Sequence, residues 1–254
     1  MLRPLLTIAS IVALLYLACC VLLFSCQRSL IYYPHPPSSA QGTSTITLPA
    51  EGAEVRVTAS PKPGPGAVVY FGGNAEDVNH SLPDLESAFP QHALYLMHYR
   101  GYGGSTGKPS ERALVADGLA LFDRVHTEHP NVVVIGRSLG SGVAIQVATS
   151  RPVSRLILVT PYNSLEELAA RQYAIFPIRW LMMDKFQSWR YAPKVTAPTL
   201  LVAAENDQIV PRQSTEALYA RFNAGVATLR EVAGTGHNTI QESPRYIPLL
   251  QGAP

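Results

Sequence analysis

The chain has 254 residues and a formal net charge of +2, with 20 Lys and Arg against 18 Asp and Glu. That length suits one α/β domain. The basic residues are scattered rather than gathered on one face, which excludes the charge pattern of a nucleic-acid-binding protein.

The first element along the chain is an uncharged apolar run from Leu5 to Cys26. At about 1.5 Å per residue, a helix of this length spans a hydrocarbon core of roughly 30 Å. It also lacks the polar face that a core helix usually carries. We therefore expect residues 1–26 to form a retained single-pass membrane anchor. Two positive charges before the run against Arg28 just after it favour a globular part on the non-cytoplasmic side.

A cleaved signal segment is the alternative, because "LFSC" ending at Cys26 resembles a bacterial lipoprotein processing site. Phe24 fits that site poorly, and the apolar run is long for a signal peptide. Cys19, Cys20 and Cys26 are the only cysteines, so the globular part has no disulfide, thiol nucleophile or thiolate metal site. Residues 27–44 are rich in proline and small polar residues, which predicts a juxtamembrane linker.

Strand and helix patterns alternate through the remainder, residues 45–254, which we take as one globular domain. Strands are predicted at 45–48, 53–59, 67–71, 93–99, 132–135, 156–159, 199–204 and 228–233. Helices are predicted at 110–128, 139–149 and 212–223, and a short one at 239–251. The central strands are almost purely apolar, which is typical of parallel strands covered on both faces. We expect a doubly wound, mostly parallel sheet with antiparallel strands at its N-terminal edge.

Residues 162–195 interrupt this alternation with an aromatic, Met-containing and mostly helical segment. The segment lies between two strands, where an open α/β sheet keeps its ligand site. We expect it to form a small cap. Its bulky apolar side chains would give a pocket a hydrophobic wall, and the alternative is that they only cover the sheet edge. They are Ile175, Phe176, Trp180, Leu181, Met182, Met183, Phe186 and Trp189.

A G-x-S-x-G motif, "GRSLG", lies at residues 136–140, where a buried strand meets a helix. This is the setting of a nucleophile elbow. The flanking glycines remove side chains that would clash in a strained turn, and the helix N-terminus offers free N–H groups beside the serine oxygen. We predict Ser138 as the nucleophile and the Leu139 N–H as one oxyanion-hole donor. On this motif alone, an idle serine in a glycine-rich turn is the alternative.

A serine nucleophile needs a base and an acid that orients the base, in the chain order Ser, acid, His for this architecture. Among six aspartates, only Asp207 lies just past a buried strand, with Glu205 as a weaker substitute. His237 alone among seven histidines follows the last strand. We predict a triad of Ser138, His237 and Asp207, which requires no metal and no cofactor. The second oxyanion donor is expected from residues 72–77.

These motifs resemble those of the α/β-hydrolase superfamily. More narrowly, they resemble the small membrane-anchored α/β-hydrolase-domain proteins that are described as lysophospholipase-like or dienelactone-hydrolase-like. The resemblance covers residues 27–254 and rests on "QRSLIYYP", "YRGYGGSTGKPSE", "GRSLGSGVA", "AENDQIVP" and "GTGHN". It implies an α/β-hydrolase fold with a short helical cap.

The resemblance also implies roles for single residues. It implies that the Asn74 N–H is the second oxyanion donor, and that Tyr99 and Arg100 support the adjoining loop. Two positions depart from the subgroup. Gly72 stands where the subgroup has a loop-shaping histidine, and His98 stands where it has Asp or Asn.

Together, these features predict a membrane-anchored serine hydrolase that cleaves carboxylic esters or thioesters through an acyl-enzyme on Ser138. The expected partners are the membrane and a small-molecule or lipid ester with a hydrophobic acyl part, and no nucleic acid. Two alternatives stay open: a serine peptidase on short peptides, and a non-catalytic membrane-tethered binding module on the same fold.

Overall fold

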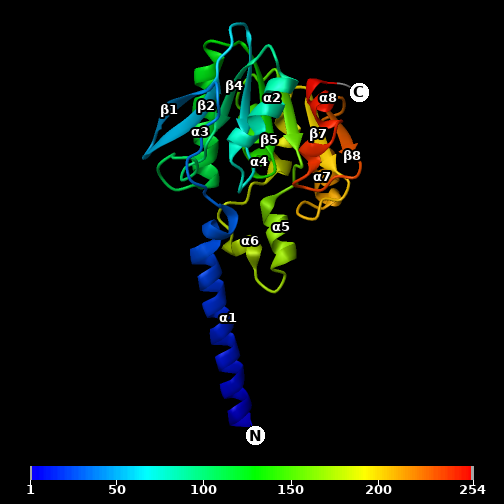
Figure 1. Cartoon of the computed structure of the whole chain (residues 1–254). Helices are drawn as coiled ribbons and strands as arrows, with labels where there is room; N and C mark the ends of the chain where they lie inside the picture. Colours follow the sequence, from blue (N-terminus) through cyan, green and yellow to red (C-terminus); the bar gives the residue numbers. More distant parts are fainter. Residues whose placement is uncertain (1, 253–254) are drawn as a thin grey trace.

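The computed structural model describes residues 2–252. A long N-terminal helix, α1 (Leu2–Ile31), projects from a globular body in which helices cover both faces of one eight-stranded sheet (Figure 1). The strands are β1 (Ser44–Ala50), β2 (Ala53–Ser60), β3 (Gly66–Phe71), β4 (Ala93–Met97), β5 (Asn131–Arg137), β6 (Arg155–Val159), β7 (Thr199–Ala204) and β8 (Ala227–Val232). The helices of the body are α2 (Leu82–Ala88), α3 (Glu111–His126), α4 (Leu139–Ala148), α5 (Leu165–Gln172), α6 (Ile178–Leu181), α7 (Arg212–Tyr219) and α8 (Tyr246–Gln251). Short 3-10 turns lie at η1 (Val78–Ser81), η2 (Ser188–Arg190), η3 (Ala192–Lys194) and η4 (Ile240–Glu242).

The strand order is β1-β2-β4-β3-β5-β6-β7-β8. β1 pairs with β2, and β2 with β4, in antiparallel register. Every pair from β4 to β8 is parallel. The predicted mostly parallel, doubly wound sheet with antiparallel N-terminal strands is therefore confirmed.

Two apolar layers sandwich the sheet. Leu121 of α3, Val143 of α4 and Leu218 of α7 belong to the layer on one face. Leu85 of α2 and Leu249 of α8 belong to the layer on the other. All residues of β3 and β7 are buried, which explains why these strands read as continuous apolar runs rather than as alternating ones.

Several elements differ from the sequence prediction; for example, α7 ends at Tyr219 rather than at residue 223, and α8 begins only at Tyr246. α2 was not predicted, because its seven residues are too few for a clear 3.6-residue period. β4 ends at Met97, two residues early, and the turn that follows it begins at Arg100. Residues 162–195 contain α5, α6 and two 3-10 turns joined by irregular chain, so the cap is less helical than expected.

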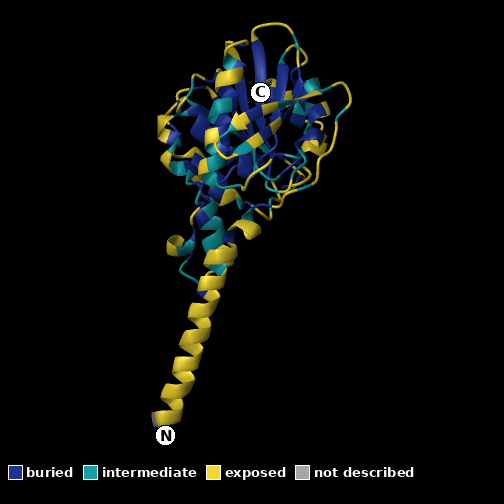
Figure 2. Cartoon of the chain, turned by 90° about the vertical axis from the view of Figure 1, so that its left-hand side faces the viewer, coloured by how far each residue is buried: buried dark blue, intermediate teal, exposed yellow. Residues whose placement is uncertain are grey.

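α1 differs from the predicted anchor mainly at its C-terminal end. It continues past Cys26 to Ile31, so the segment expected to be a linker begins with helix. Gln27 to Leu30 contain no helix breaker, and Pro34 disfavours helical backbone just before it. The helix over residues 3–31 is long and apolar enough to cross a membrane. Its most apolar 18-residue stretch has a mean hydropathy of 2.7, and 6% of that stretch is buried. Most of α1 is exposed (Figure 2), so it is not a core helix of the body.

Candidate active site

Ser138 lies between β5 and α4 in a strained conformation, with φ 49° and ψ −117°. Such backbone is costly for a residue other than glycine and persists only where the surroundings enforce it. A Cβ atom at Gly136 would lie 2.4 Å from the Gly140 carbonyl oxygen, and one at Gly140 would lie 2.0 Å from that of Phe71. The two glycines therefore let α4 pack directly on the ends of β3 and β5. This close approach holds the Ser138 turn in place.

His237 links the other two predicted triad residues. Its Nε2 lies 2.8 Å from Ser138 Oγ, and its Nδ1 lies 2.8 Å from Asp207 Oδ2. The His237 and Asp207 side chains are 7% and 4% exposed. Because a carboxylate can only accept, we assign the imidazole proton to Nδ1, which leaves the Nε2 lone pair for the serine hydroxyl.

Asp207 is held by its own turn after β7. Its Oδ1 accepts hydrogen bonds from the backbone N–H groups of Ile209 and Val210, at 2.9 and 2.7 Å. Glu205, the substitute considered from the sequence, instead accepts the Gly234 N–H at 2.7 Å. The structure thus brings Asp207, and not Glu205, to the histidine.

Leu139 and Asn74 both lie beside Ser138, at the start of α4 and in the loop after β3, and all three line one cavity. Within residues 2–252, neither the Leu139 N–H nor the Asn74 N–H donates a backbone hydrogen bond. The carbonyl of Asn74 is fixed by the Tyr102 hydroxyl at 2.6 Å and the Tyr33 N–H at 3.1 Å. Both backbone donors are thus available to an oxygen atom on the substrate.

The loop at 72–77 is ordered without the histidine that the subgroup carries. The Tyr99 hydroxyl donates to the Gly72 carbonyl at 2.8 Å, and Glu76 accepts the Gly73 N–H at 2.7 Å. A Cβ atom at Gly72 would lie 2.7 Å from Val78 Cγ1, so the packing here leaves little room for a side chain.

Arg100 supports the neighbouring turn through a bidentate ion pair. Its Nε and Nη2 donate to the two carboxylate oxygens of Asp117, each at 2.8 Å. This pair and the Tyr99 contact agree with the supporting roles that the resemblance implied for Tyr99 and Arg100.

A buried ion pair behind the triad was not foreseen from the sequence. Arg137 Nη1 donates to Glu76 Oε2 at 3.0 Å, and Arg137 Nη2 donates to the His237 carbonyl at 3.2 Å. Burial, the largest single influence, lowers the pKa of the Arg137 guanidinium, but its neighbours, with Glu76 first among them, together raise that pKa. Burial and Glu76 raise the pKa of Tyr70, so its hydroxyl stays protonated and donates to Glu76 at 2.6 Å. The one sequence signal for this ion pair is the position of a charged residue, Arg137, at the end of a buried strand.

Two cavities meet at Ser138. One, of about 420 Å³, is mainly apolar and is lined by α1, by the cap and by Leu139. The other, of about 570 Å³, is lined mostly by polar residues, among them Glu76, Arg137 and His237, and is called the polar cavity below. Ser138 and Asn74 line both, whereas His237 lines only the polar one.

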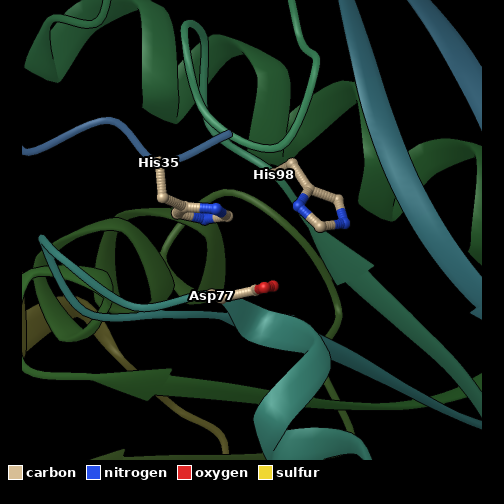
Figure 3. Close-up of side chains that lie close together, drawn as sticks. All are labelled: His35, Asp77 and His98. Carbon is tan, nitrogen blue, oxygen red and sulfur yellow. The ribbon is translucent and has the colours of Figure 1, made fainter. Parts of the chain in front are cut away.

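A second cluster of titratable groups lies at the end of the 72–77 loop, which contributes Asp77 to it (Figure 3). Ligand atoms of His35, Asp77 and His98 lie within 4.8 Å of one another, an arrangement that could suit a metal ion. His98 Nε2, however, is bonded to Thr58 Oγ1 at 2.8 Å. A Cβ atom at Gly103 would lie 2.1 Å from His98 Nδ1, so the Gly103 backbone already covers that nitrogen.

His98 Nε2 is therefore occupied, whereas Nδ1 is buried against the Gly103 backbone without a hydrogen-bond partner among the described residues, and we derive no metal chemistry from the cluster. Burial lowers the pKa of His98 to about 4, so the ring is neutral. The Gly103 N–H donates to the His35 carbonyl at 3.0 Å. This contact places the segment after α1 beside the turn that contains Gly103.

Comparison with known proteins agrees with this geometry. The serine hydrolase family profile matches residues 113–246. An uncharacterised protein of Mycobacterium tuberculosis, Rv2307c, is 34% identical over 251 residues, which cover 92% of this chain and 88% of that protein. The lysophosphatidylserine lipase ABHD12 of Macaca fascicularis is 30% identical over 217 residues, which cover 72% of this chain and 54% of that protein.

Solved structures share the fold at low sequence identity. Mouse alpha/beta hydrolase domain-containing protein 10 matches with a TM-score of 0.65 at 19% identity, over 82% of this chain and 95% of that one. Est1E of Butyrivibrio proteoclasticus, solved with ferulic acid, matches with a TM-score of 0.67 at 15% identity, over 81% and 96% of the two chains. The chain belongs to the serine hydrolase family of α/β hydrolases.

Proposed function

We propose that this protein is a membrane-anchored hydrolase of carboxylic esters or thioesters with a hydrophobic acyl part, acting through an acyl-enzyme on Ser138. The observation that carries the proposal is the position of Ser138. Its Oγ lies 2.8 Å from His237 Nε2, at the junction of an apolar and a polar cavity. A substrate that joins an acyl chain to a polar group would fit this junction. ABHD12, by its name, acts on a lipid of that kind.

The chemistry follows from the three side chains. Ser138 Oγ attacks the ester carbonyl while His237 Nε2 takes its proton, and Asp207 stabilises the imidazolium that forms. The N–H groups of Leu139 and Asn74 hold the oxyanion. His237 then gives the proton to the departing alcohol or thiol. In the second half of the reaction, His237 takes a proton from water, which attacks the acyl carbon. His237 returns that proton to Ser138 Oγ as the carboxylic acid leaves.

Proton transfer fixes which part of the substrate occupies which cavity. The leaving group must lie near His237 Nε2, because that nitrogen protonates it. His237 lines only the polar cavity, so the alcohol belongs there. The acyl chain then occupies the apolar cavity, among side chains such as Leu168 and Ile178 of the cap.

The apolar cavity also supports a retained anchor. Leu23, Leu30 and Ile31 of α1 line it together with Ser138. Processing at Cys26 would remove Leu23 from the cavity wall. We therefore favour the retained anchor, with the catalytic domain on the non-cytoplasmic side as the charges around the run indicate.

The test is kcat/KM for p-nitrophenyl esters of increasing acyl length, measured on the full chain in detergent micelles. Each methylene buried in the cavity contributes up to about 0.8 kcal/mol of transition-state binding, a factor of nearly four. We expect kcat/KM to rise with acyl length beyond acetate and to vanish in Ser138→Ala. A profile that peaks at acetate would contradict the hydrophobic acyl part. Turnover by Ser138→Ala within about tenfold of wild type would contradict the nucleophile.

A further inference from the structure

One stripe of residues along α1 is partly buried against other parts of the chain, although most of this helix is exposed. Tyr16, Cys20, Leu23 and Gln27 recur at helical spacing and so lie along one side of the helix. Cys20 and Gln27 are 8% and 9% exposed and Tyr16 is 41% exposed, whereas Leu22 on another side is 63% exposed. Other parts of the chain therefore pack against this stripe from Cys20 to Gln27 and cover it partly at Tyr16, about 16 Å of helix in all.

The cap packs on that stripe at both of its ends. The Tyr16 hydroxyl donates to the Ile175 carbonyl at 2.9 Å, and its ring stacks on Phe176 with centroids 5.7 Å apart. Gln27 Nε2 donates to the Leu181 carbonyl at 3.1 Å. Figure 1 shows α5, α6 and the loop between them beside the upper part of α1, below the body. The cap thus extends along the helix and away from the sheet.

The length of the apolar run fixes the depth of these contacts. Arg3 and Arg28 bracket the run and lie about 37 Å apart along the helix axis. Because a hydrocarbon core is roughly 30 Å thick, the helix can slide by no more than about 7 Å with both charges outside. Tyr16 lies near the middle of the run, so every such position leaves it inside the hydrocarbon. The part of the cap that contacts Tyr16 must then also lie inside the hydrocarbon, about 10 to 18 Å below the boundary on the C-terminal side of α1.

The composition of the cap tip suits that location. Residues 172–178 carry no charge and are flanked by Arg171 and Arg179. Ile175 at the tip is 76% exposed and Trp180 is 89% exposed. Exposure of such large apolar side chains to water is unfavourable. An uncharged loop with arginines at its ends and a tryptophan beside it is typical of a segment that enters a leaflet from the headgroup side.

We infer that the cap tip, residues 172–178, is inserted in the leaflet that surrounds the C-terminal half of α1. The apolar cavity lies between the cap and α1, with Leu23 and Leu181 in its wall and Ser138 at its inner end. An amphiphilic ester can then pass from the bilayer through this cavity with its polar group leading, so that the alcohol reaches the polar cavity beyond Ser138 and the acyl chain stays in the apolar one. This route for the substrate rests on the proposed hydrolase activity, and the insertion of the tip rests only on the proposed membrane span of α1.

Insertion is tested by fluorescence of the full chain in phosphatidylcholine vesicles whose acyl chains carry bromine at mid-chain. The chain has 2 tryptophans, Trp180 and Trp189, so replacing both with Phe and adding Ile175→Trp places one reporter at the tip. We expect bromine to quench that reporter and to spare Trp189, measured in Trp180→Phe. Quenching of the tip reporter by aqueous iodide but not by bromine would overturn the inference.

The route is tested by turnover of two esters, one dispersed in the bilayer and one water-soluble. Ile175→Asp places a charge in the leaflet without touching the cavity, so we expect about a tenfold or greater loss on the bilayer ester and none on the soluble one. Tyr219→Asp, at an exposed site on the body, is the control and should change neither rate. Unchanged turnover of both esters by Ile175→Asp would overturn the route. A wild-type protein that turns over neither ester while its tip reporter is quenched would contradict the proposed function and leave the insertion standing.

Discussion

Replacing Asp207 with Asn should abolish most of the activity without unfolding the protein. Asp207 accepts three hydrogen bonds, two at Oδ1 from the turn N–H groups of Ile209 and Val210 and one at Oδ2 from His237. In Asp207→Asn the amide oxygen keeps the two backbone bonds, so the amide NH₂ faces His237 Nδ1. Two donors then meet unless the imidazole adopts its other tautomer. In that tautomer Nε2 carries a proton and cannot take the one on Ser138.

The cost of the wrong tautomer is about 10⁴ in kcat in serine proteases with this arrangement, or roughly 5.5 kcal/mol of activation free energy. We expect a similar loss here, measured as kcat on a saturating p-nitrophenyl ester, with thermal unfolding unchanged. Glu205→Gln is the matched control, because its amide oxygen can still accept the Gly234 N–H. Retention of more than about a tenth of kcat by Asp207→Asn, or a larger loss in Glu205→Gln, would refute the assignment of the acid.

Three further predictions concern the cavity, the ion pair and acid stability. Ala169→Phe adds a ring to the wall of the apolar cavity, so kcat/KM should fall for long acyl chains and stay unchanged for acetate; an equal fall for both would mean a general distortion. Arg137→Leu leaves the Glu76 carboxylate, 8% exposed, without its partner and should lower the free energy of unfolding in urea by about 3–5 kcal/mol. Adding Glu76→Gln should restore part of that loss. Folded His98 stays neutral down to about pH 4 while an unfolded histidine takes a proton near pH 6.5, so wild type should lose stability as the pH falls through that window and not above it, by at most about 3 kcal/mol. His98→Asn should lack this part of the slope, and an identical slope in both proteins would contradict the buried neutral ring.

The sheet could be predicted because its strands are buried on both faces and therefore stand out as apolar runs. The carboxyl ends of parallel strands meet at one edge of the sheet, so the residues that follow β5, β7 and β8 are expected to lie together there. Ser138, Asp207 and His237 occupy those positions, and His237 lies within hydrogen-bonding distance of the other two.

What escaped prediction depends on contacts between distant segments. Gln27 is the polar first residue of the predicted linker, yet it is 9% exposed, and its Nε2 donates a hydrogen bond to the carbonyl of Leu181, 154 residues away. Arg28 pairs with Asp184 at 3.0 Å in the same region. No periodicity in residues 27–44 indicates either partner. The buried pair of Glu76 and Arg137 was missed for the same reason, because each side chain alone resembles a solvated charge.

Covalent labelling of the full chain with a fluorophosphonate tests the central claim, that Ser138 is an activated nucleophile. The strained turn, the 2.8 Å contact with His237 Nε2 and the two free N–H donors predict rapid formation of a phosphonyl adduct. Mass spectrometry of the digested protein should find the adduct on the peptide that contains Ser138, and Ser138→Ala should carry none. Absence of labelling in the folded wild-type protein, or equal labelling of Ser138→Ala, would contradict the account.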